Sequence, residues 1–134
     1  MFGDADPDRA VEIAMNAKFA TSGQDCLAAN RIFVHRSIED AFLERFSARI
    51  AALRVGPGLN ETTQIGPLMH ERAIAKVEAQ VANALALGAR CLTGGTRHPA
   101  GPLFFTPTLL AGVPDEAVIM REETFGPVAA VTVF

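Results

Sequence analysis

The sequence lacks the patterns that mark several large classes of protein. Its two cysteines are too few for a disulfide framework, and neither they nor the three histidines have the spacing of metal ligands. A net charge of −3 argues against the basic surface that binds nucleic acid. No apolar run approaches the roughly 18–20 residues of a membrane helix, and the first residues do not resemble a signal peptide. We therefore expect a reduced, cytoplasmic protein with no metal, membrane span or nucleic-acid partner.

The chain does have the length and composition of one globular domain. Its 134 residues fall within the roughly 100–200 residues of a typical domain. Hydrophobic residues make up 49% of the chain and charged residues 20%, which is close to the average of folded proteins. There is no internal repeat and no low-complexity tract. The sequence therefore predicts a single domain over residues 1–134.

Hydrophobic periodicity predicts three helices. An Asp-Pro pair, typical of a helix start, opens the first helix over residues 7–20. Ser37 followed by Asp40 resembles a capping box, and the second helix continues to about residue 53. The third helix covers residues 70–87. Its predicted buried face consists of Ile74, Val77, Val81 and Leu85.

Short β-branched and apolar runs predict strands at residues 31–35, 90–93, 108–110 and 128–134. Because helices alternate with these strands, we expect a layered α/β fold, in which helices flank a sheet. Residues 1–2 are interpreted as the tail of a further strand. The last strand is so apolar that it needs neighbours on both faces, and no later sequence supplies them. Both ends therefore suggest a fragment of a larger fold.

Cys26 is the first candidate for chemistry. It lies between a helix break and a strand, where amide N–H groups of a turn favour the thiolate nucleophile, although the neighbouring Asp25 opposes it. The alternative is a buried structural thiol, which is the more common fate of a free cysteine and which the residue pattern alone favours. For Cys91, inside a short apolar strand, the structural interpretation is stronger still.

Residues 122–127, Glu-Glu-Thr-Phe-Gly-Pro, are the second candidate. A carboxylate at such a turn can bind a sugar hydroxyl, and the adjacent aromatic ring can pack against another planar ring. The alternative is a solvated acidic turn, which the residues alone favour.

Both segments nevertheless resemble motifs of the aldehyde dehydrogenase superfamily. Residues 23–26 (Gly-Gln-Asp-Cys) are similar to the motif of its nucleophile, and residues 122–128 are similar to its acidic Phe-Gly-Pro motif. Between them, residues 65–68 (Ile-Gly-Pro-Leu) and 105–109 (Phe-Thr-Pro-Thr-Leu) match in the family's order. Within this superfamily, the sequence most resembles the succinate-semialdehyde dehydrogenases. The resemblance implies part of a catalytic domain, without the dinucleotide-binding region and the C-terminal part.

The resemblance also implies a reaction. Cys26 would attack an aldehyde, succinate semialdehyde in that subgroup, to give a thiohemiacetal. Hydride would pass to NAD or NADP, and water would hydrolyse the remaining thioester to the acid. Glu123 would hold the nicotinamide ribose, and Phe125 would lie beside the nicotinamide ring. The general base, the oxyanion-binding Asn and most of the cofactor site would lie outside the chain, so we expect the isolated 134 residues to be inactive.

Two observations leave alternatives open. Ala20 occupies the position where succinate-semialdehyde dehydrogenases often carry an Arg that binds the substrate carboxylate.

The same sequence also fits a non-catalytic interaction module built on this fold, or a thiol-based redox protein that uses Cys26. Exposed apolar strand edges favour association, so we expect a homo-oligomer.

Overall fold

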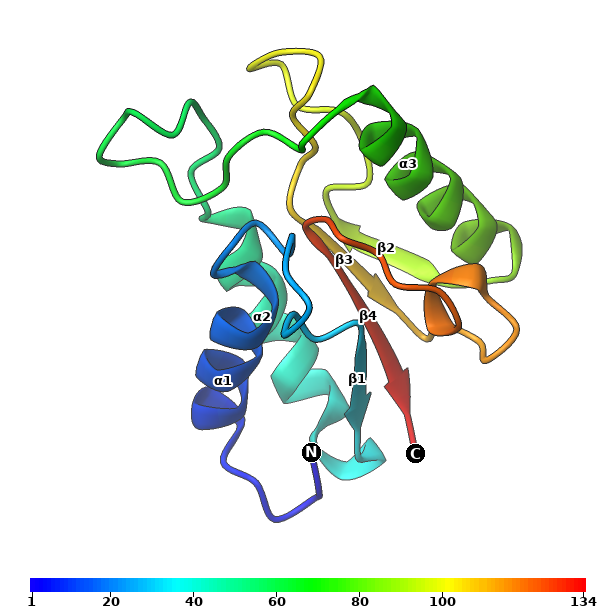
Figure 1. Cartoon of the computed structure of the whole chain (residues 1–134). Helices are drawn as coiled ribbons and strands as arrows, with labels where there is room; N and C mark the ends of the chain where they lie inside the picture. The colour runs from blue at the N-terminus through cyan, green and yellow to red at the C-terminus, as the bar shows by residue number, and fades with distance from the viewer.

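The computed structural model describes residues 1–134, which form three α-helices and one four-stranded sheet (Figure 1). The helices are α1 (Pro7–Phe19), α2 (Glu39–Ala51) and α3 (Glu71–Ala86), with 3-10 turns at Arg36–Ile38 and Val118–Met120. The strands are β1 (Arg31–Val34), β2 (Arg90–Thr93), β3 (Thr108–Ala111) and β4 (Val128–Val133). The predicted order of helices and strands is confirmed. None of the helices has the length and hydropathy that a membrane span requires.

The last strand of the chain lies inside the sheet. The strand order is β1-β4-β3-β2, with β4 parallel to both of its neighbours and β2 antiparallel to β3 at the edge. Figure 1 shows β4 in red between β1 and β3. The neighbours that this apolar strand was predicted to need on both faces come from earlier in the chain, because Ala129 and Val131 pack in one core and Val128 and Ala130 in the other. Residues 128–131 are fully buried.

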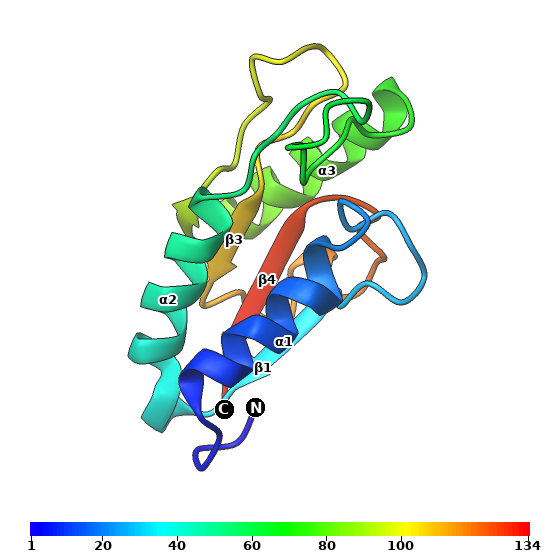
Figure 2. The ribbon, with the colours of Figure 1, turned by 90° about the vertical axis from the view of Figure 1, so that its left-hand side faces the viewer.

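Helices cover both faces of the sheet. Alternate residues of a strand point to opposite faces, so Leu109 and Val131 belong to the core beneath α1 and α2, while Leu110 and Ala130 belong to the core beneath α3. Figure 1 shows α1 and α2 on one side of the sheet and α3 on the other, and Figure 2 views the first side face on. The result is the layered α/β fold that the sequence predicted.

Helix α1 begins as its sequence predicts. The Asp6 carboxylate accepts a hydrogen bond from the backbone N–H of Arg9 at 2.9 Å, and Pro7 occupies the first turn, where its missing N–H costs nothing. Ahead of α1, the amine of Met1 donates a hydrogen bond to the carbonyl of Phe33, and the carbonyl of Met1 accepts one from the backbone N–H of His35. Residues 1–2 belong to no strand of the structure, in contrast to the predicted strand tail.

The start of α2 differs from the prediction. Ser37 does not cap the helix, because Ile38 occupies the N-cap position and makes no side-chain cap. Instead the His35 ring accepts a hydrogen bond from the backbone N–H of Ser37 and begins a 3-10 turn ahead of the helix. The predicted capping box is therefore wrong, since the turn consumes the residues that would form it.

The buried face of α3 also differs at one position. Ile74, Val77 and Val81 are buried as predicted, but the next buried residue is Ala84, whereas Leu85 is 41% exposed. Ala84 lies three residues after Val81 and Leu85 lies four residues after it, and both spacings are compatible with one helical face. The small side chain of Ala84 allows the helix to approach the sheet closely, which turns Leu85 towards solvent.

The aromatic contact between α1 and α2 gives a test of the core. Phe46 is fully buried and its ring lies 5.0 Å from that of Phe42 and 6.3 Å from that of Phe19, between centroids. We expect Phe46→Ala to lower the free energy of unfolding by about 3–5 kcal/mol, because it leaves a cavity. Phe33→Ala, at a half-exposed position, is the control and should cost much less. Urea unfolding measures both, and equal losses would contradict this account of the core.

Candidate active site

Two segments that are a hundred residues apart in sequence meet at one corner of the fold. Gly23, before the thiol, and Gly126, before β4, approach so closely that a Cβ atom at Gly23 would collide with the carbonyl oxygen of Gly126. The side chain of Asn30 accepts a hydrogen bond from the backbone N–H of Thr124 at 3.2 Å. The structure therefore brings together the two motifs that the sequence singled out.

The turn that carries Cys26 is built by Asp25. The Asp25 carboxylate accepts hydrogen bonds from the Thr21 hydroxyl and from the backbone N–H of Leu27, both at 2.6 Å. The bond from Thr21, followed by that from Leu27, lowers the pKa of Asp25 below its usual range. Cys26 itself is exposed. Asp25 is thus a structural residue of the turn, a role that the sequence did not indicate.

Gln24 fastens this turn to a neighbouring loop. Its side-chain amide donates to the carbonyl of Pro67 at 3.0 Å, and its side-chain oxygen accepts from the backbone N–H of Met69 at 3.0 Å. Ser22 adds a third link, because its hydroxyl accepts from the N–H of Gly66 at 2.9 Å. The loop that precedes α3 is therefore held against the thiol turn.

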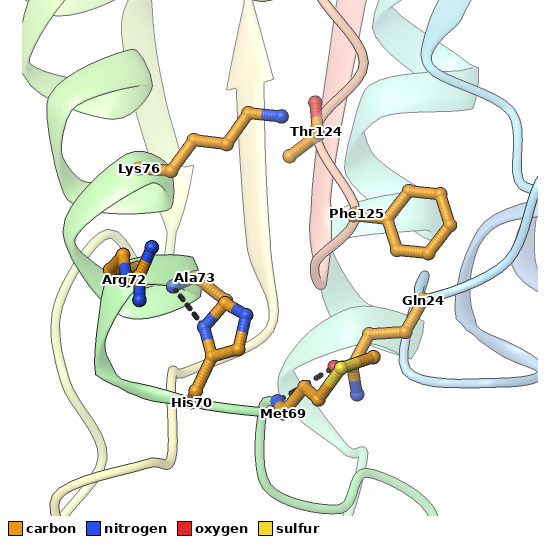
Figure 3. Close-up of a pocket in the computed structure, with 8 residues that line it drawn as sticks. All are labelled: Gln24, Met69, His70, Arg72, Ala73, Lys76, Thr124 and Phe125. Carbon is orange, nitrogen blue, oxygen red and sulfur yellow. Dashed lines mark hydrogen bonds between the residues drawn. The ribbon is translucent and has the colours of Figure 1, made fainter.

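Phe125 lies beside a cavity of about 250 Å³ that Gln24 and Thr124 also line. Figure 3 shows Arg72 and Lys76 on the α3 side of this cavity, with Lys76 extended towards Thr124. The cavity therefore has a cationic wall and an aromatic wall. The Thr124 hydroxyl is buried and has no hydrogen-bond partner in the chain.

The predicted site residues do not share one cavity. Glu123 is exposed and lines a separate cavity of about 220 Å³ with Asn30 and Arg31. The residues that flank Cys26, Asp25 and Leu27, line a third cavity of about 240 Å³. The structure thus places Cys26, Glu123 and Phe125 on segments in contact with one another, but within this chain their side chains border different spaces.

Lys18 is a site residue that the sequence reasoning missed. It is only 1% exposed, and its amine has no hydrogen-bond partner. Burial lowers the pKa of Lys18 to about 8, against the opposing effect of the carboxylates of Asp25 and Glu123. A buried charge without a partner is costly. The signal was present in the sequence, since Lys18 occupies a position on the apolar face of α1.

Cys91 differs from its prediction. It lies in a strand as predicted, but the prediction of a buried structural thiol is wrong, because β2 is an edge strand whose first three residues are exposed to solvent. Its thiol donates a hydrogen bond to the carbonyl of Thr93 at 3.3 Å. Partial desolvation of the sulfur raises the pKa of Cys91 above its usual range.

Comparison with known proteins assigns the fold and this corner of it to a family. The model of the aldehyde dehydrogenase family matches residues 1–134. The chain belongs to the aldehyde dehydrogenase family. A crystal structure of succinate-semialdehyde dehydrogenase from Burkholderia pseudomallei superposes with a TM-score of 0.98 at 46% identity, over 100% of this chain and 28% of that one.

Two curated relatives are semialdehyde dehydrogenases. The non-phosphorylating aspartate-semialdehyde dehydrogenase of Halomonas elongata is 54% identical over 96% of this chain and 26% of its own length. The NADP(+) succinate-semialdehyde dehydrogenase of Escherichia coli is 46% identical over 96% of this chain and 27% of its own length. The chain therefore spans about a quarter of the length of these relatives.

The close contact at Gly23 can be tested with a matched glycine. Gly23 has a φ of +70° and no room for a side chain, whereas a Cβ atom at Gly58 would meet nothing within 4 Å. We expect Gly23→Ala to destabilise the protein by more than about 1–2 kcal/mol, because it combines a left-handed backbone with a collision. Gly58→Ala should change stability by less than about 1 kcal/mol. Thermal unfolding of both variants checks this, and similar effects would contradict the contact.

The buried amine of Lys18 predicts a pH-dependent stability. The unfolded chain holds this proton up to about pH 10.5 and the folded chain only up to about pH 8. Stability therefore rises with pH between these values, as the charge is lost from the fold. We expect Lys18→Met to be more stable than the natural protein at pH 7, by up to about 3 kcal/mol, with an advantage that shrinks by pH 10.

Urea unfolding at pH 7 and at pH 10 measures this difference. Lys76→Met is the control, because Lys76 is exposed, and it should change stability little at either pH. A destabilised Lys18→Met at pH 7 would show that the amine makes a favourable contact in the natural protein.

Proposed function

We propose that this chain is part of the catalytic domain of an enzyme that oxidises an aldehyde to a carboxylic acid with NAD or NADP. The observation that carries the proposal is the contact of the Cys26 turn with the segment of Glu123 and Phe125, through Gly23 and Gly126. In this proposal the contact keeps the nucleophile Cys26 close to Glu123, suited to hold a sugar, and to Phe125, suited to lie against a planar ring. Membership of the family and the names of the relatives support the same reaction.

In this proposal Cys26 is the nucleophile. Its exposure lets an aldehyde approach, and its sulfur forms a bond to the carbonyl carbon to give a thiohemiacetal. The backbone N–H of Cys26 has no acceptor within the chain, so it is available to the oxygen that becomes negatively charged. After the carbon is oxidised, water releases the acid from the resulting thioester and regenerates the thiol.

The residues beside Phe125 fit part of a nicotinamide cofactor. The unpartnered Thr124 hydroxyl offers a hydrogen bond, and Arg72 and Lys76 offer positive charge to a phosphate. Glu123 would accept hydrogen bonds from the ribose hydroxyls, and Phe125 would lie against the ring. When bound, the nicotinamide supplies the acceptor for the hydride that leaves the substrate carbon. The E. coli relative, which is named for NADP(+), supports a cofactor of this kind.

The role of Cys26 is tested with Cys91 as the internal control. In the complete natural protein, we expect Cys26→Ala to lower kcat for aldehyde oxidation at least about 10³-fold, because no other group replaces the nucleophile. Cys91→Ala should leave kcat within about twofold. In the natural protein, limiting iodoacetamide should label Cys26 before Cys91, since the raised pKa of Cys91 reduces its thiolate. Formation of the reduced cofactor and peptide mass spectrometry provide the two readouts.

The outcomes also separate the competing functions. A natural protein that labels at Cys26 but reduces no cofactor with any aldehyde would favour a thiol-based redox protein or an interaction module. Full activity in Cys26→Ala, or preferential labelling of Cys91, would remove Cys26 from the proposed mechanism.

A further inference from the structure

Phe125 adopts a backbone conformation that a bulky residue rarely takes. Its φ of +52° lies in the left-handed region. Such a conformation costs free energy and persists only where the surrounding structure holds it in place. The direction of the side chain depends on this backbone, so whatever holds the backbone also holds the Phe125 ring beside the cavity of about 250 Å³ (Figure 3).

The residues on both sides of Phe125 are held by the part of the chain that leads into β1. After Phe125, the carbonyl of Gly126 lies against Gly23, with no room for a side chain between them. Before Phe125, the backbone N–H of Thr124 donates a hydrogen bond to the side-chain oxygen of Asn30 at 3.2 Å. The strained residue is thus bracketed by one backbone contact and one side-chain hydrogen bond.

Asn30 lies on a stretch of backbone that is itself anchored. The residue before it, Ala29, donates its backbone N–H to the carbonyl of Ala17 in α1 at 2.8 Å. The residue after it, Arg31, is the first residue of β1, and its guanidinium donates to the carbonyl of Met120 at 3.3 Å. The side chain of Asn30 therefore has a fixed base from which it reaches a segment 94 residues further along the chain.

The backbone N–H of Thr124 has no other acceptor in the chain. Thr124 is only 1% exposed, so without Asn30 its N–H would lie unpaired away from water, which is unfavourable. The segment can avoid this only by moving Thr124 towards another acceptor, and such a move changes the backbone next to Phe125. The loss of the acceptor at Asn30 should therefore displace the Phe125 ring.

We propose that Asn30 is a positioning residue, which through the backbone of Thr124 holds the Phe125 ring where the nicotinamide ring is received. The inference rests on the proposed function, in which Phe125 lies against that ring. It adds a side chain that acts on the cofactor through Phe125 and that connects the segment of the nucleophile to the segment of the cofactor.

The first test is cofactor binding by the complete natural protein. We expect Asn30→Ala to raise the Kd for NADH or NADPH, whichever binds, about 3- to 10-fold, because one hydrogen bond no longer holds the ring in place. The KM for the oxidised cofactor should rise in parallel. The KM for the aldehyde and the rate at which iodoacetamide labels Cys26 should stay within about twofold, because Asp25 and Gln24 hold the thiol turn independently. Fluorescence of the reduced cofactor measures the Kd.

Two further variants separate the hydrogen bond from a general loss of structure. Asn30→Asp keeps an oxygen that can accept from the N–H of Thr124, and it should recover part of the affinity. Asn60→Ala is the matched control, because Asn60 also accepts a hydrogen bond from a backbone N–H, that of Thr62 at 3.0 Å, but in the loop after α2. It should leave the Kd within about twofold of the natural value.

A double substitution tests whether Asn30 acts through Phe125. Phe125→Ala removes the ring, so Asn30→Ala added to it should weaken cofactor binding by less than about a further twofold. A direct contact of Asn30 with the cofactor would add its full effect in both backgrounds.

Hydrogen exchange gives a readout that needs no cofactor. The amide of Thr124 should exchange faster in Asn30→Ala than in the natural protein or in Asn60→Ala. An unchanged Kd, an unchanged exchange rate or additive effects of the two substitutions would overturn the inference. If the natural protein binds neither NADH nor NADPH, the proposed function fails, while the exchange of Thr124 still decides whether Asn30 holds this segment.

Discussion

The close approach of Gly23 to the carbonyl of Gly126 is the constraint on which the rest of the site depends. The space between the two backbones is too small for any side chain at Gly23, and Gly23 also adopts the left-handed conformation that glycine tolerates best. Because the contact is made by backbone, it fixes the two segments without using the side chains of Cys26 and Glu123. Those side chains remain free for chemistry.

The sheet explains why these two segments can meet. β1 and β4 are adjacent parallel strands, so the N-terminal ends of both strands lie at the same end of the sheet. The Cys26 turn precedes β1, and the segment of Glu123 and Phe125 precedes β4. The first turn leads into β1, an edge strand that buries Ile32 and Val34, and the second leads into β4, whose residues 128–131 are fully buried. Groups placed on rigid elements hold their relative positions better than groups on long loops.

The sequence predicted the elements better than it predicted their exposure. The start of α1 followed from local chemistry at Asp6, and the order of helices and strands followed from periodicity. The errors at Leu85 and Cys91 concern which side of an element meets solvent, and that depends on neighbours distant in the chain. The central position of β4 depends on pairings of the same kind. The cavities beside Glu123 and Phe125 are formed by segments remote in sequence, so no local pattern reveals them.

Ser22 and Phe125 are the chain's two non-glycine residues with a positive φ, at +57° and +52°. Each immediately precedes one of the two glycines in contact, so the unfavourable backbone conformations are concentrated at one corner. A left-handed residue of this kind costs about 1–2 kcal/mol, and the buried layers of the fold compensate for it. The strained backbone therefore stands on both sides of the contact between Gly23 and Gly126. It persists there because the surrounding packing leaves this corner no other conformation.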